Sequence, residues 1–164
     1  MHRSPFIAAA LAALAACVGN ADPEQPAPTA SDSISMTRGP CFGACPMYTV
    51  TVYGDGRVVF RGDRFVAETG ERTKTIGAAE AAALFAAADS IDFHRLPADI
   101  TPANQDACGA SWTDMPSAEV TVRWNARMHT VNHYHGCPKA PERLTQFENR
   151  IDAVAGIAPW IVRD

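Results

Sequence analysis

One alternating segment, Met47–Tyr53, limits most strongly what this chain can fold into. Its sequence MYTVTVY places a tyrosine and two valines on one face of an extended backbone, and two threonines on the other. This period of two predicts a β-strand with one buried face. The turn signal Gly54-Asp55-Gly56 follows, so residues 57–61 are predicted to form the returning strand of a hairpin.

The rest of the chain contributes further strands and two helices. Apolar residues recurring at strand or helix spacing predict strands at residues 34–37, 65–69, 117–124 and 127–134, and helices at 78–88 and 141–154. The order β-β-β-α-β-β-α predicts an α+β domain, in which an antiparallel sheet of about five strands carries two helices packed on one face.

The composition indicates one globular domain, predicted at residues 34–164. The chain has 164 residues, of which 47% are hydrophobic and 20% charged. Its formal charge is −4 and it has only two lysines, so we expect no nucleic-acid partner. Residues 97–116 carry three prolines and no periodic pattern. So long an irregular loop in a compact domain suggests a function or a covalent tie.

The N-terminal residues resemble a secretion signal. The apolar run 6–16 has 11 residues, too short to span a bilayer, which takes about 20. It ends in Leu14-Ala15-Ala16-Cys17, which resembles the lipobox of bacterial lipoproteins. The resemblance implies that residues 1–16 are removed and that Cys17 is acylated, with palmitate among the chains. The alternative is an ordinary signal peptide cut after Ala21.

Residues 17–33 are predicted to be a flexible tether, rich in proline and alanine, behind the lipidated cysteine. By resemblance to sorting in Gram-negative bacteria, Val18 in place of an aspartate implies the outer membrane, facing the periplasm. We therefore expect the lipid on Cys17 to make the membrane one partner of this protein.

Four cysteines remain beyond Cys17, and the cell envelope is oxidising, so two disulfides are expected. Four cysteines allow three pairings. We favour Cys41 with Cys45, a small ring containing a glycine, and Cys108 with Cys137, which ties the long loop to the second hairpin.

Residues 41–50, CFGACPMYTV, resemble the opening block of an uncharacterised bacterial family. That block is C-F-G-x-C-P-x-Y-x-V, followed by an Asp-Gly turn and a strand. The similarity extends over most of residues 34–160. Such domains of unknown function are common in secreted and lipid-anchored proteins, and the resemblance implies no particular activity. It does not account for Cys108 and Cys137.

The spacing Cys-x-x-x-Cys-Pro also resembles the metal motif of Sco-type copper chaperones. Cys41 and Cys45, with His133 88 residues further on, would suit Cu(I). His129 and His135 lie on the same side of that predicted strand. In Sco proteins, however, the motif runs into a helix of a thioredoxin fold, whereas here it precedes a strand. We therefore expect no cofactor and no metal, and a copper-binding or thiol-redox protein is the alternative.

No catalytic motif frames the serine, histidine and aspartate residues of the chain. The sequence therefore favours a non-catalytic binding or structural module over an enzyme. The expected partner is an envelope protein or a cell-wall component. Trp112, the large aromatic residue of loop 97–116, is the candidate contact residue; alternatively, it packs that loop onto the core.

Overall fold

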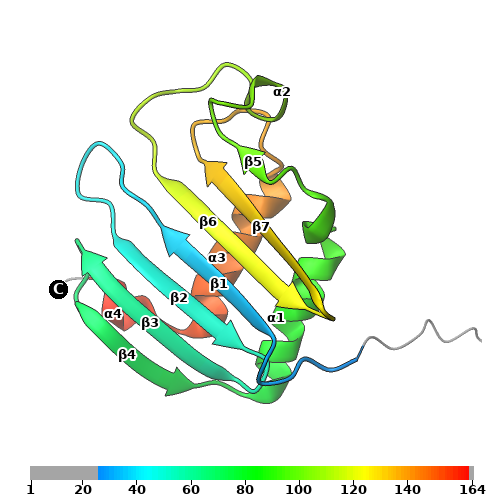
Figure 1. Ribbon diagram of the computed structural model, residues 1–164. Coiled ribbons are helices and arrows are strands. Elements are labelled where there is room, and N and C mark those ends of the chain that lie inside the picture. Colours follow the sequence, from blue (N-terminus) through cyan, green and yellow to red (C-terminus); the bar gives the residue numbers. More distant parts are fainter. Residues whose placement is uncertain (1–25, 163–164) are drawn as a thin grey trace, which may run out of the picture.

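The computed structural model describes residues 26–162, in which helices cover one face of an open sheet (Figure 1). The strands are β1 (Ser33–Arg38), β2 (Met47–Tyr53), β3 (Arg57–Arg64), β4 (Gly70–Thr75), β5 (Asp99–Ile100), β6 (Ser117–Trp124) and β7 (Arg127–Tyr134). The helices are α1 (Ala78–Ser90), the 3-10 turn η1 (Phe93–Arg95), α2 (Gln105–Cys108), α3 (Glu142–Ala155) and α4 (Ala158–Ile161). Among these residues, no helix has both the length and the apolar character that crossing a bilayer requires.

Strand β1 lies at the centre of the sheet, whose order is β4-β3-β2-β1-β6-β7-β5. It is antiparallel to both neighbours, with Met36 opposite Val50 of β2 and Val120 of β6. The other strand pairs are also antiparallel, except that the short β5 runs parallel to β7. Strand β1 thus joins the β2–β3 hairpin to the β6–β7 hairpin.

The core lies between the inner face of this sheet and the helices α1 and α3 (Figure 1). Strand β2 alternates as its sequence predicts, with Tyr48, Val50 and Val52 buried. Helix α3 presents a buried stripe that includes Leu144 and Ile151. The sequence-based prediction of an α+β domain with helices on one face therefore holds.

The number of strands differs from the prediction, since the sheet formed by the described residues has seven rather than about five. The strand predicted at residues 65–69 is wrong: these residues mostly form bends, and β4 begins at Gly70. Strand β4 lies at the edge of the sheet, and its residues GERTKT are almost all exposed, so they carry no apolar alternation. The patternless segment 97–116 contains β5 and α2, both too short to show a period.

The β6–β7 turn offers a test of this backbone. Asn125 and Ala126 both have left-handed conformations, with φ of 53° and 58°. Such a turn matches the twist of a hairpin, but alanine is strained in it. We expect Ala126→Gly to raise the free energy of unfolding by about 1 kcal/mol in urea denaturation. Asn125→Gly should change it less, because asparagine tolerates this conformation. Destabilisation by Ala126→Gly would contradict the turn geometry.

Candidate functional site

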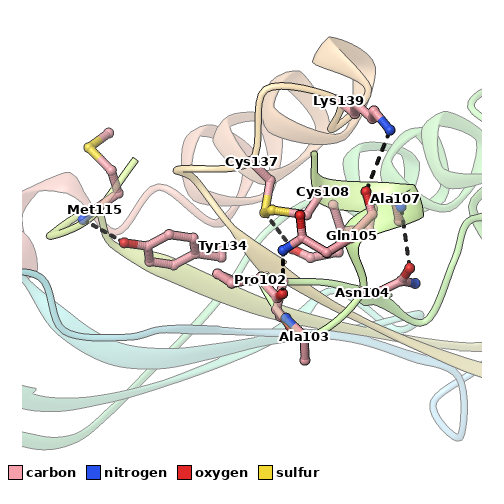
Figure 2. The surroundings of a disulfide bond; sticks show 12 residues. Pro102, Ala103, Asn104, Gln105, Ala107, Cys108, Met115, Tyr134, Cys137 and Lys139 are labelled. Atoms are coloured by element: carbon pink, nitrogen blue, oxygen red, sulfur yellow. Dashed lines mark hydrogen bonds between the residues drawn. A yellow bond between two sulfur atoms is a disulfide. The ribbon is translucent and has the colours of Figure 1, made fainter. Parts of the chain in front are cut away.

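Two disulfides lie at the end of the sheet where β1 and β7 end and β2 and β6 begin. Cys41 is joined to Cys45 within the β1–β2 loop, with a Cα–Cα distance of 5.8 Å. Cys108 at the end of α2 is joined to Cys137 after β7, with a Cα–Cα distance of 4.5 Å (Figure 2). These are the two pairs favoured from the sequence. The second disulfide gives the long loop 97–116 the covalent tie that its length suggested.

The two loops touch through their backbones. The amide N–H of Phe42 donates to the carbonyl oxygen of Asp114 at 3.2 Å, which joins the β1–β2 loop to loop 97–116. Loop 97–116 is also held to the residues after β7, because the Trp112 amide donates to the carbonyl oxygen of Gly136 at 2.9 Å. The hydroxyl of Tyr134 accepts a hydrogen bond from the Met115 amide (Figure 2). We call residues 39–46 and 109–116 together the tip.

Large apolar side chains of the tip face solvent. The exposed fraction is 87% for Phe42, 63% for Trp112 and 39% for Met115. The exposure of Trp112 therefore does not fit the alternative in which this side chain packs its loop onto the core. Beside the tip lies a pocket of about 230 Å³, lined by Arg38, Gly39, Cys45, Pro46, Tyr48, Pro116 and Ile161.

A buried polar group lies behind the tip, beneath α3. Its centre is Glu148, whose side chain is fully buried. The ring nitrogen Nδ1 of His133 lies 2.7 Å from Glu148 Oε1 in a hydrogen bond. His135 Nε2 lies 2.9 Å from Glu148 Oε2, but in a direction that makes no well-formed hydrogen bond. The two imidazole rings stack, with centroids 4.5 Å apart.

Arg38, at the end of β1, connects this group to a second carboxylate. Its guanidinium lies 3.3 Å from Glu148 and 3.0 Å from Asp152, which is one helical turn further along α3. The Tyr48 hydroxyl donates to Asp152 at 2.8 Å. We call Arg38, Tyr48, His133, His135, Glu148 and Asp152 the Glu148 cluster.

Burial and pairing act in opposite directions on the carboxyl groups of this cluster. Burial alone raises the pKa of Glu148, but its contacts with His133 and His135 outweigh burial and lower that pKa to about 2. For Asp152, burial dominates and raises the pKa despite Arg38 and Tyr48. Burial, followed by the charge of Asp152, raises the pKa of Tyr48. Glu148 is therefore the carboxylate held most firmly in its ionised form.

The structure does not bring together the residues of the copper alternative. Cys41 and Cys45 form a disulfide and so offer no thiolates to Cu(I), and His133 contacts Glu148 instead. His129 lies apart from the other two histidines and contacts the carbonyl oxygen of Leu96. Cys17 lies outside the described residues.

The sequence alone does not single out Arg38, Glu148 and Asp152 as members of a site. A signal for Glu148 is present, because it lies four residues after Leu144 and three before Ile151, within the buried stripe of α3. A carboxylate in such a stripe needs a partner on the opposing strands. Nothing in the sequence indicates that this partner is a pair of histidines from β7 and the residues after it.

The described residues thus form an α+β domain with a disulfide-bonded apolar tip and a buried charged cluster. Residues 32–155 match the model of DUF6438, a domain of unknown function, and the chain belongs to this family. None of the curated proteins matches the chain.

The lowered pKa of Glu148 predicts a pH-dependent stability. Since its unfolded value is 4.5, the carboxylate's contribution is fully present above about pH 4.5 and is lost as the pH falls toward 2. Glu148→Gln should therefore destabilise the protein by about 3 kcal/mol at pH 7, and by less as the pH approaches 2. Urea unfolding across this pH range measures the difference.

The exposed pair of Arg61 and Glu71 provides the control. Glu71→Gln should change the free energy of unfolding by less than about 1 kcal/mol at every pH. An equal effect of Glu148→Gln at pH 7 and pH 2.5 would contradict the assignment of Glu148 as an ionised, paired carboxylate.

Proposed function

We propose that this protein is a lipid-anchored, non-catalytic binding module of the cell envelope, whose tip contacts an envelope protein. In this proposal Cys17 carries the lipid, and residues 17–33 link it to the domain. The observation that carries the proposal is the exposure of Phe42 and Trp112 on two disulfide-bonded loops joined by the Phe42–Asp114 hydrogen bond.

The direction of β1 supports this arrangement. The chain reaches β1 at Ser33, paired with Tyr53 and Arg123 at one end of the sheet. The tip follows Arg38 at the other end, six residues and about 20 Å away (Figure 1). A tether attached at Ser33 therefore leaves the tip facing away from the point of attachment.

The chemistry of the tip favours a protein over a cell-wall polymer. Residues 39–46 contain no charged side chain, and residues 109–116 contain only Asp114. Exposed aromatic and methionine side chains with few charges are typical of the centre of protein–protein interfaces. Scattered apolar residues elsewhere need no such explanation, but Phe42 and Trp112 are both exposed on loops that a backbone hydrogen bond joins.

The lipid anchor can be tested at Cys17. We expect Cys17→Ser to abolish labelling by radioactive palmitate and to move the protein from the membrane fraction to the soluble fraction, because the acceptor thiol is lost. Val18→Asp is the matched control: it should keep the label but shift the protein from the outer to the inner membrane. Membrane attachment of Cys17→Ser without label would contradict lipid anchoring.

The tip can be tested by photo-crosslinking in living cells. A crosslinker at position 112 should give a discrete protein adduct. In the double variant Phe42→Ser, Trp112→Ser the crosslinker is placed at position 115 instead, and the yield of this adduct should fall at least about 10-fold. Position 128 is the matched control, because Met128 is 60% exposed at the opposite end of β7.

The same adduct from positions 112 and 128 would contradict a specific tip surface. Absence of any protein adduct, together with retention of the wild type but not the double variant on isolated cell-wall sacculi, would assign the tip to a cell-wall component. Neither outcome depends on the result for Cys17.

A further inference from the structure

We propose that His133, His135 and Glu148 form a binding site for one divalent metal ion, with Zn²⁺ as the best fit. Each residue contributes one ligand atom, and these three atoms all lie within 4.8 Å of one another. The inference is independent of the lipid anchor and of the tip's partner.

The donor set matches zinc chemistry. Two imidazole nitrogens and one carboxylate oxygen suit Zn²⁺ in tetrahedral geometry, and a set of three protein ligands leaves a fourth position for water or another ligand. His135 is the side chain that faces outward, with 18% of its surface exposed, whereas His133 and Glu148 are buried. The fourth position would therefore lie toward solvent beside His135.

Metal binding requires the three ligand atoms to adjust their spacing. The His133–Glu148 and His135–Glu148 atom pairs are 2.7 and 2.9 Å apart. With metal–ligand bonds of about 2.0–2.1 Å, tetrahedral ligand atoms lie about 3.3 Å apart. The Glu148 carboxylate must therefore move away from both nitrogens by roughly half an ångström, and the two histidine nitrogens, which lie within 4.8 Å of each other, must reach the same spacing. Each neutral imidazole then carries its proton on the ring nitrogen that faces away from the metal.

His135 provides a second observation. Its Nε2 atom is buried beside the carboxylate without a well-formed hydrogen bond. A buried polar nitrogen without a partner is unfavourable, and a metal ion between this nitrogen and Glu148 would give it one.

The charge balance of the Glu148 cluster also favours a cation. Apart from the histidines, the two carboxylates of Glu148 and Asp152 share one guanidinium, that of Arg38. Arg38 does not have to leave when metal binds. The Nη2 group of Arg38 already donates to Asp152 at 3.0 Å and to Asn149 at 3.2 Å. The Nη1 group contacts Glu148 at 3.3 Å, the longest of these three distances.

The experiment uses the full chain purified in detergent, with disulfides intact, after treatment with a chelator. Titration with ZnCl₂ by calorimetry should show one site per chain with micromolar or tighter affinity. Co²⁺ should give the intense visible bands of a tetrahedral complex. At a free Zn²⁺ concentration of 100 times the Kd, the Tm should rise by about 5–10 °C.

The variants His135→Ala and Glu148→Gln should each weaken Zn²⁺ binding at least about 10-fold. His129→Gln is the matched control, since His129 lies on β7, the strand of His133, but contacts Leu96. This variant should bind Zn²⁺ like the wild type. Circular dichroism checks folding. If Glu148→Gln fails to fold, His135→Ala decides, because it removes a partly exposed ring without a well-formed hydrogen bond.

Three outcomes would overturn the proposal. They are the absence of saturable Zn²⁺ binding, unchanged affinity in folded His135→Ala, or an equal loss in His129→Gln. NMR of the histidine rings adds a direct readout: Zn²⁺ should shift the ring signals of His133 and His135 and leave those of His94 and His129 in place.

Discussion

The pairing of β1 with both β2 and β6 is the interaction on which the rest of this structure depends. β2 is separated from β6 by more than sixty residues, and within residues 26–162 only β1 joins the hairpin formed by β2 and β3 to the hairpin formed by β6 and β7. All six residues of β1 are paired on both sides. The same strand carries Arg38 into the Glu148 cluster and leads directly into the tip, so it positions both candidate sites.

Sequence patterns predict the parts of this fold that bury one face. Strands β2, β6 and β7 and helix α3 alternate or repeat clearly because one side of each lies against the core. Strand β4 has no such side: it is a polar edge strand that pairs only with β3, so its residues do not reveal it. Strand β5 has two residues and is defined by its neighbour β7. Patterns of period two or 3.6 carry no information about either strand.

The candidate sites divide in the same way. The cysteines could be paired from compartment and spacing, and Trp112 stood out by its size within an irregular loop. The Glu148 cluster could not be assembled, because its members come from β1, β2, the end of β7 and α3, and only the tertiary fold brings them together. Glu148 alone showed a local anomaly, a carboxylate within a buried helical stripe.

Burial of Glu148 is difficult to explain by stability alone. Replacing a buried ion pair by apolar side chains is often neutral or stabilising, so the cluster is weak evidence for a stabilising role. What it does fix is geometry: it holds the ends of β1 and β7 against α3, at the positions from which the disulfide-bonded loops emerge. Loops that are already ordered lose less conformational entropy when they bind, so more of the contact energy remains as affinity. A rigid base behind two covalently closed loops is therefore the arrangement that the proposed contact surface requires.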